Sequence, residues 1–248
     1  MGATAICEYL EWDSQFFGRR IARANASCLT EELAAEIETW CNVHQIECLY
    51  FLASSSDRET AKIAQVNMFR LVDVRVTLDL CVDSDSIPGA SRIGVRSAVE
   101  HDIPALRAIA RTAHRDSRFY YDGNFPDRLC GELYETWVEK SCRGLATKVF
   151  VAGEANDIAG YVTCHLSDRL TGQVGLVGVA TNSQGKRIAS GLVSHAVGWF
   201  AQEGVETVRV ATQGRNVRAQ RLYQRCGFVT RSAELWYHRW FSEGRKSP

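Results

Sequence analysis

The residues from Val177 to Leu192 have the arrangement best suited to binding an anion. An apolar stretch, Gly175 to Val179, predicts a short strand, and a polar loop follows it at Thr181 to Ser183. The sequence Gln184 to Ala189 then predicts the start of a helix that carries a glycine, a lysine and an arginine. Free N–H groups at a helix N-terminus, the helix dipole and nearby cations together hold phosphate groups. This order of elements predicts a pyrophosphate site, although a plain structural turn can have the same pattern.

Two familiar phosphate motifs are absent from this segment. It has no G-x-x-x-x-G-K-[ST] sequence, which excludes a P-loop, and no G-x-G-x-x-G fingerprint of dinucleotide binding. The nature of the anion therefore has to come from other parts of the chain.

The elements before residue 91 predict a small domain of their own. Hydrophobic periodicity predicts helices over Glu31 to Asn42 and Glu59 to Met68, and strands over Cys48 to Ala53 and Leu71 to Leu80. The polar, turn-rich segment Asp83 to Ser91 is typical of a linker. We therefore expect an N-terminal α/β domain over residues 1–90 and a second domain over residues 91–248.

The second domain is expected to hold a mixed sheet. Asp102 and Pro104 are a good helix start, with a cap followed by proline, and that helix is expected to run to Ala113. The elements expected around it are a strand (93–98), a charged and aromatic loop (114–122), a helix (126–142), three strands (147–152, 158–166 and 173–179), the helix from Gln184, a strand (207–211), a short helix (217–226) and a last strand (228–239). Because helices and strands do not alternate strictly, the order favours an α/β fold with a mixed sheet over a doubly wound one.

Composition narrows the class of protein. A chain of 248 residues holds one large or two small domains, and its formal net charge of zero argues against a nucleic-acid partner. No apolar run reaches the length of a membrane span and the N-terminus has no signal-peptide pattern, so we expect a cytoplasmic protein without a membrane partner. The nine cysteines form no C-x-x-C pair, so we expect neither a disulfide framework nor a bound metal.

A second motif indicates what the anion could be. Asn216 to Phe228 reads Asn-Val-Arg-Ala-Gln-Arg-Leu-Tyr-Gln-Arg-Cys-Gly-Phe and resembles N-x-x-A-x-x-x-Y-x-x-x-G-F, a signature of the GCN5-related N-acetyltransferase (GNAT) superfamily. Val179 to Ala189 resembles the acyl-coenzyme A loop of the same superfamily, Q/R-x-x-G-x-G/A. Arg187 stands where that loop usually has its first glycine. Since an arginine can adopt helical dihedrals and adds a cation, we expect binding to be retained.

The resemblance extends over nearly the whole chain to one branch of the superfamily. Four segments are similar to parts of bacterial TDP-fucosamine acetyltransferases, enzymes of surface-glycan synthesis: Leu10 to Gly18, Asp102 to Arg107, Ser117 to Phe119 and Val208 to Gln213. The resemblance implies a GNAT fold with a smaller N-terminal domain. It also implies direct transfer of acetyl from acetyl-coenzyme A (acetyl-CoA) to the 4-amino group of a TDP-linked 4-amino-4,6-dideoxy sugar, with no metal.

The same resemblance implies a set of cofactor-binding residues. The main-chain N–H groups of the loop would hold the pyrophosphate of coenzyme A, the strand edge would pair with pantetheine, and Asn216 would both cap its helix and contact pantetheine. The residues expected to bind the cofactor are Val177, Val179, Gln184, Gly185, Lys186, Arg187, Ile188, Ala189 and Asn216. The alternative is a solvated basic helix start above an ordinary core strand.

Tyr223 is the expected catalytic residue. Coenzyme A leaves as a thiolate, and a phenol within hydrogen-bond reach can protonate that sulfur. The alternative is an aromatic residue packed on an amphipathic helix. The general base stays open between His165, Asp168 and a chain of water molecules, and a backbone N–H at or near Val179 is expected to stabilise the oxyanion.

The loop that begins at His114 is the candidate for binding the acceptor. Arginine suits phosphate, and aromatic rings suit a base or a sugar. The residues expected to bind the substrate are Arg115, Ser117, Arg118, Phe119 and Tyr121, with Tyr120 as a further stacking candidate. A charged surface loop is the alternative.

Two other functions remain open from the sequence. A GNAT enzyme could act on another small amine or on a protein N-terminus. Because Arg187 departs from the motif, an inactive coenzyme A-binding protein is the other alternative. The oligomeric state is not readable from the sequence, and a homodimer is one candidate.

Overall fold

The structure is a computed structural model that describes residues 5–82, 94–154 and 157–241. The chain divides into two compact units, which are described separately. Unit 1 comprises Met1–Arg75, Tyr121–Phe125 and Ala233–Pro248, and unit 2 comprises Val76–Tyr120 and Pro126–Ser232. The boundary expected at residue 90 and the linker Asp83–Ser91 lie outside the described residues, so that division stays a prediction.

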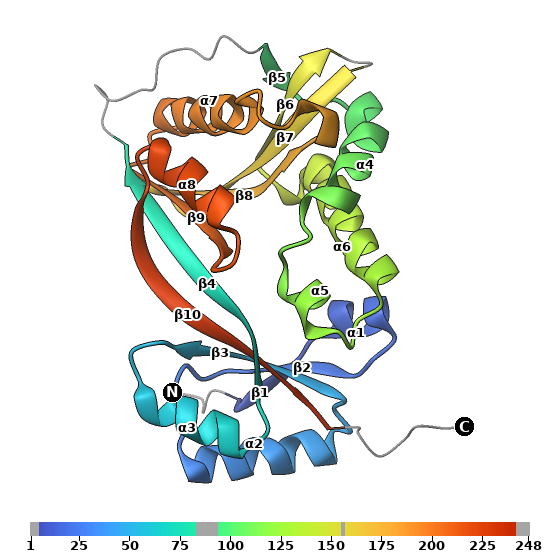
Figure 1. Cartoon of the computed structure of the whole chain (residues 1–248), viewed down its shortest axis with the longest axis vertical. Helices are drawn as coiled ribbons and strands as arrows, with labels where there is room; N and C mark the ends of the chain where they lie inside the picture. The colour runs from blue at the N-terminus through green and yellow to red at the C-terminus, as the bar shows by residue number, and fades with distance from the viewer. Residues whose placement is uncertain (1–4, 83–93, 155–156, 242–248) are drawn as a thin grey trace. The chain divides into compact units, whose positions relative to one another are not determined.

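Unit 1 is built on strands in the order β1-β2-β3-β10-β4 (Figure 1). β2 runs parallel to β3, whereas β1 pairs antiparallel with β2 and β10 antiparallel with β3. The elements of this unit are β1 (Cys7–Tyr9), α1 (Glu11–Phe17), β2 (Ile21–Ala24), α2 (Glu31–Val43), β3 (Cys48–Ser54), α3 (Arg58–Val66), the first half of β4 (Arg70–Cys81) and the second half of β10 (Val229–Trp240).

Helix boundaries in unit 1 follow local chemistry. The Thr30 hydroxyl accepts a hydrogen bond from the Leu33 N–H and caps α2, and Asp57 caps α3 in the same way through the Glu59 N–H. Helix α1 ends at Gly18, whose φ of 63° is a left-handed conformation that glycine adopts without strain. The predicted helices and strands are confirmed here. The β1, α1 and β2 elements were missed because each is too short for a periodic signal.

Unit 2 has strands in the order β10-β4-β9-β8-β7-β6-β5. Its mixed sheet confirms the predicted fold class. The elements are β5 (Val95–Ser97), α4 (Ile103–Ala113), α5 (Arg118–Asp122, shared with unit 1), α6 (Asp127–Lys140), β6 (Lys148–Glu154), β7 (Asp157–Leu166), β8 (Thr171–Val179), α7 (Ile188–Gln202), β9 (Thr207–Gln213), α8 (Val217–Arg225) and the second half of β4 with the first half of β10.

Helices α7 and α4 cover opposite faces of this sheet (Figure 1). A side chain at Gly160 would meet Ile188 and Leu192 of α7, whereas the next residue of β7, Tyr161, is hydrogen-bonded to His114 at the end of α4. Because neighbouring residues of a strand point to opposite faces, the two helices lie on different sides. The apolar face of α7 packs into the core, with Leu192, Ala196 and Phe200 fully buried.

Asp102 differs from its predicted role. It stands at the start of α4, with a proline in the first turn, but its side chain makes no cap hydrogen bond to that helix. Instead its buried carboxylate accepts two hydrogen bonds from Arg96, at 2.7 and 2.8 Å, and one from the Val99 N–H. The ion pair with Arg96 therefore ties the start of α4 to β5.

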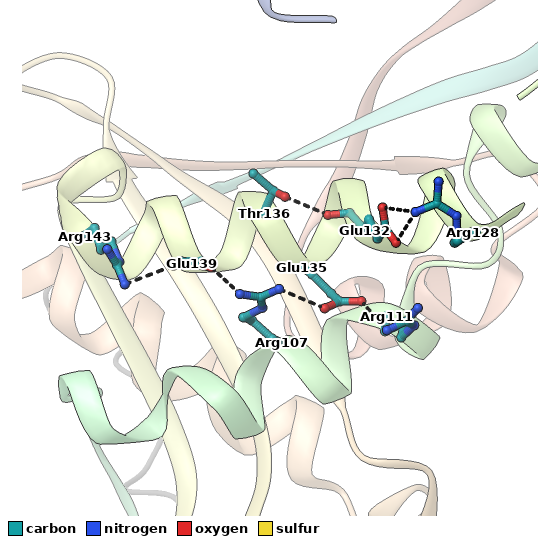
Figure 2. A network of polar contacts seen from close by, with 8 residues as sticks. All are labelled: Arg107, Arg111, Arg128, Glu132, Glu135, Thr136, Glu139 and Arg143. Atoms are coloured by element: carbon teal, nitrogen blue, oxygen red, sulfur yellow. Dashed lines mark hydrogen bonds and ion pairs between the residues drawn. The ribbon is translucent and has the colours of Figure 1, made fainter. Parts of the chain in front are cut away.

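Ion pairs join α4 to α6 along their length (Figure 2). Arg107 donates to Glu139 at 2.7 Å and to Glu135 at 3.3 Å, and Arg111 lies 3.1 Å from the other oxygen of Glu135. The Glu135 side chain is only 9% exposed, so both arginines are needed to compensate its charge. The network thereby fixes the C-terminal end of α4.

We expect Glu135→Ala to lower the free energy of unfolding by about 1–3 kcal/mol, because it leaves two arginines without their shared partner. Glu132, whose side chain is 33% exposed and pairs with Arg128 on the same helix, provides the matched control. Glu132→Ala should cost about 0.5 kcal/mol or less. Urea denaturation measures both, and equal losses would contradict the structural role of the network.

Candidate active site

One cavity of unit 2 collects most of the predicted cofactor residues. Its volume is about 320 Å³. Its walls are β8, the loop before α7 with the first turn of that helix, the helix α8 with Asn216 before it, the last residue of α4 and a residue in the turn after α4. The lining residues are Ala113, Asp116, Val177, Val179, Ser183, Gln184, Gly185, Arg187, Ile188, Ala189, Ser190, Asn216, Arg218, Ala219, Leu222, Tyr223 and Arg225. Of the nine predicted cofactor residues, only Lys186 does not line it.

A bulge in β8 opens one wall of this cavity. Val177 pairs with Val162 of β7 and Val174 with Cys164, so Gly175 and Leu176 together face the single residue Thr163. The Thr163 hydroxyl accepts the Leu176 N–H at 2.8 Å, which satisfies the displaced amide. A side chain at Gly175 would come within 2.6 Å of that hydroxyl, so the bulge requires glycine here.

The parallel ladder between β8 and β9 ends at the same place. Thr171 pairs with Thr207 at the start of this ladder, and Val174 pairs with Val210 at its end. The strand β8 itself continues to Val179. The edge of β8 beyond Val174 is therefore free of β9 and can offer its N–H and C=O groups to an extended ligand. Val177 and Val179, which line the cavity, lie on this free stretch.

The loop before α7 is shaped differently from the prediction. The helix begins at Ile188 rather than at Gln184, and Arg187 is its N-cap residue with φ 60° and ψ 17°. The expectation that Arg187 keeps helical dihedrals is therefore wrong. It takes a left-handed conformation, as the glycine usual at this position would do without strain.

The anion-binding features of this loop are nevertheless present. In α7 the first intrahelical bond from this end joins the Gly191 N–H to the Arg187 carbonyl, so the N–H groups of Ile188, Ala189 and Ser190 are not used by the helix. Three arginines line the same cavity: Arg187, Arg218 and Arg225. Amides and cations of this kind suit a phosphorylated ligand.

Helix α8 contributes more to the cavity than the sequence motif indicated. Arg218 donates to the Gln184 side chain at 3.0 Å and joins α8 to the loop before α7. Arg218, Ala219, Leu222 and Arg225 were missed as lining residues, although their spacing around Tyr223 places them on the same face of the helix. Helical spacing applied to the motif would have found them.

Asn216 caps α8 and also lines the cavity. Its side-chain oxygen accepts the Ala219 N–H at 3.0 Å. A carboxamide also carries an NH2 group, which can donate to a ligand while the oxygen makes the cap. The two predicted roles of Asn216 are thus compatible.

Tyr223 is buried in the wall of the cavity. It is 5% exposed and packs edge-on against Phe228, with ring centroids 5.8 Å apart. Burial raises the pKa of the Tyr223 phenol above its usual value of 10.0, because the charged phenolate is poorly solvated there. The phenol therefore holds its proton at neutral pH.

Neither predicted general base lines the cavity. His165 lies on β7 against Gly175, and burial lowers the pKa of its imidazole. The Asp168 carboxylate accepts the N–H groups of Leu170 and Thr171, at 2.9 and 2.8 Å, and so shapes the turn before β8. Asp168 therefore has a structural role in this turn.

None of the five predicted substrate residues lines the cavity. Phe119 is 1% exposed and packs on Trp137, so its ring is a core residue and the prediction that it stacks on a ligand is wrong. Ser117 is buried as well, whereas Arg115 is exposed and lies 3.7 Å from Asp127. The Arg118 guanidinium lies 4.3 Å from the Phe119 ring, and Tyr121, in unit 1, is 56% exposed.

The comparisons with known proteins agree with the motifs. A profile described as the Acetyltransferase (GNAT) family matches residues 109–228. The chain is 31% identical to a dTDP-fucosamine acetyltransferase of Escherichia coli over 245 residues, which covers 96% of this chain and 100% of that protein. The chain belongs to the GNAT family of acetyltransferases.

Two further similarities place this GNAT acetyltransferase among its relatives. It is 30% identical to the spore coat polysaccharide biosynthesis protein SpsD of Bacillus subtilis over 139 residues, which are 56% of this chain and 48% of that protein. A crystal structure of a GCN5-related N-acetyltransferase from Sphaerobacter thermophilus has the same fold, with a TM-score of 0.68 at 18% identity, over 97% of this chain and 78% of that one.

His114 was missed as a structural residue of the GNAT unit. Its imidazole is half-buried, stacks on Tyr134 at 4.5 Å between centroids, and is hydrogen-bonded through Nε2 to the Tyr161 hydroxyl at 2.9 Å. Burial lowers the pKa of His114 from 6.5 to about 4. A pair of a histidine and a tyrosine far apart in sequence leaves no signal in a single chain.

We expect His114 to make the stability of the enzyme fall in acid. The folded state takes up this proton only near pH 4, whereas the unfolded state takes it up near pH 6.5, so stability is lost as the pH falls through that window. The loss should be on the order of 2 kcal/mol, after allowance for the partial exposure of the ring. Urea denaturation of the wild type and of His114→Gln between pH 4 and 7 measures it, and parallel curves would contradict it.

We expect Arg187→Gly to stabilise the fold by about 1 kcal/mol, because glycine removes the left-handed strain. The same change should weaken acetyl-CoA binding about fivefold or more, since a cation leaves the phosphate site. Thermal unfolding and calorimetric titration measure the two effects. Lys186→Ala, the neighbouring cation outside the cavity lining, is the control and should change affinity less. Equal affinity losses in the two variants would contradict the role of Arg187.

Proposed function

We propose that this GNAT acetyltransferase moves acetyl from acetyl-CoA to the 4-amino group of a TDP-linked 4-amino-4,6-dideoxy sugar. The proposal is supported chiefly by the cavity, whose lining includes a free strand edge, a helix start with unused N–H groups and a buried phenol. The similarity of the whole chain to a dTDP-fucosamine acetyltransferase supports the choice of this sugar as the acceptor.

The residues of the cavity suit a direct transfer. The pyrophosphate would lie on the N–H groups before and within the first turn of α7, with Arg187 and Arg218 beside it. Pantetheine would extend along Val177 and Val179, and a backbone N–H of that edge would stabilise the oxyanion. The acceptor ammonium first gives a proton to water, and the neutral amine then attacks the thioester carbon. As the carbon–sulfur bond breaks, the Tyr223 hydroxyl gives its proton to the sulfur, and the proton that the nitrogen releases on forming the amide returns through water to the phenolate.

A mass-spectrometric assay with acetyl-CoA tests the proposal. The acceptors are several TDP-linked amino sugars, an aminoglycoside and a peptide with a free N-terminus. We expect an acetylated product and free coenzyme A with a TDP-4-amino-4,6-dideoxy sugar. If the aminoglycoside or the peptide were acetylated faster than the TDP-linked sugars, the proposed acceptor would be wrong and the faster substrate would take its place. Binding of acetyl-CoA without turnover on any amine would favour an inactive coenzyme A-binding protein.

We expect Tyr223→Phe to lower kcat by about 100-fold or more, because the leaving thiolate loses its proton donor. The affinity for acetyl-CoA should change little, since the ring is retained. Tyr237→Phe, which changes a buried tyrosine of unit 1, is the control. Steady-state kinetics separates the effects, and an unchanged kcat in Tyr223→Phe at saturating substrates would remove this residue from the mechanism.

A homodimer and a cytoplasmic location remain predictions.

A further inference from the structure

Asp116 is the one acidic residue in the described lining of the cavity. The same lining holds three arginines: Arg187, Arg218 and Arg225. A carboxylate is unfavourable in a site built for the phosphates of coenzyme A, because like charges in a partly desolvated cavity repel. Its presence there is explained if it faces a ligand group of positive charge.

The position of Asp116 is fixed from two sides. Its main-chain carbonyl accepts a hydrogen bond from Arg215 at 3.1 Å, in the loop that precedes α8. Two residues earlier, the imidazole of His114 is held by the Tyr161 hydroxyl on β7. The Ser117 N–H in turn donates to the His114 carbonyl at 3.3 Å. The turn that carries Asp116 is therefore anchored to the strand beside β8 and to the start of α8.

The Asp116 carboxylate is not used within the described part of the protein. In that part it forms no ion pair, whereas Arg115 beside it lies near Asp127, and Glu135 and Glu139 of α6 are paired with arginines. The guanidinium of Arg215 donates to the main-chain carbonyl of Asp116 and not to its carboxylate. The carboxylate in the cavity wall is therefore available to a ligand.

The wall that carries Asp116 is also the wall that the donor does not need. β8, the loop before α7 and α8 supply the groups proposed to hold acetyl-CoA. Of the described lining, only Ala113, the last residue of α4, and Asp116, in the turn that follows, come from another part of the chain. Tyr161, to which this turn is anchored, lies against Gly178 of β8, on the face of the strand opposite to Val177 and Val179.

We propose that Asp116 binds the positively charged amino group of the acceptor and so selects amines over alcohols of the same shape. The inference rests on the proposed function, since it assigns the amine end of that acceptor. The carboxylate would accept charge-assisted hydrogen bonds from the ammonium group, which are stronger than those between neutral partners.

The test compares a charged and a neutral ligand in two enzymes. Calorimetry measures the affinity of the full-length enzyme for a TDP-4-amino-4,6-dideoxy sugar and for its 4-hydroxy counterpart, with coenzyme A present in place of acetyl-CoA so that no transfer occurs. We expect the wild type to prefer the amine by about tenfold or more and Asp116→Asn to lose that preference. Glu203→Gln, an exposed residue at the end of α7, is the matched control and should keep it.

The ligand pair separates recognition of charge from a structural effect. If Asp116 only shaped the turn, Asp116→Asn would weaken the binding of both ligands equally. The preference for the amine over the alcohol would then survive, and the inference would be overturned. An unchanged affinity for the amine in Asp116→Asn would overturn it as well.

A second ligand pair separates this inference from the proposed function. It consists of a 4-amino-4,6-dideoxyhexose without the nucleotide and its 4-hydroxy counterpart. If only this pair binds, and the preference for the amine depends on Asp116, the nucleotide acceptor is wrong and the inference stands. If the TDP-linked amine is acetylated but the preference survives in Asp116→Asn, the proposed function stands and the inference falls. Binding of neither pair would contradict both.

Discussion

The separation of β8 from β9 is the constraint on which the site depends. Hydrogen bonding between these parallel strands ends at Val174 and Val210, where the bulge at Gly175 and Leu176 bends β8. The displaced N–H of Leu176 donates to the Thr163 hydroxyl on β7. The strand β8 can therefore diverge from β9 without leaving that amide unpaired on its β7 side. Every other part of the cavity is arranged around the edge that this departure exposes.

The cavity lining carries charges of both signs. The amides at the start of α7 and the arginines near them favour negative charge, and Arg187 supplies one of these cations from a backbone conformation that glycine would adopt more easily. A residue kept in such a conformation is consistent with a contribution to function that offsets the strain. Asp116 adds a negative charge to the same lining, which also holds the buried, protonated phenol of Tyr223. The cavity thus suits a polyanion and a cation at once.

The sequence indicated the parts of the site that lie on local motifs and missed those that depend on tertiary contacts. Asn216 and Tyr223 stand in a motif with helical spacing, and the loop before α7 in a second one, so both were found. Asp116 lines the cavity through the packing of separate elements, which no local pattern records, whereas Arg218 and Arg225 share a helical face with Tyr223 and could have been found from that spacing. Phe119 was assigned to a ligand because aromatic rings suit stacking, but the same ring suits a core, and only burial decides between the two. Likewise, the left-handed Arg187 could not be inferred from a residue type that prefers helical dihedrals.

The central claim is that the cavity places the thioester of acetyl-CoA between the free edge of β8 and Tyr223. A crystal structure of the enzyme with acetyl-CoA bound tests it most directly. The account expects the sulfur atom within about 4 Å of the Tyr223 hydroxyl, which is the reach of a hydrogen bond to sulfur, and pantetheine hydrogen-bonded to the main chain of Val177 or Val179. A complex with the sulfur far from Tyr223, or with the cofactor in another part of unit 2, would contradict the account.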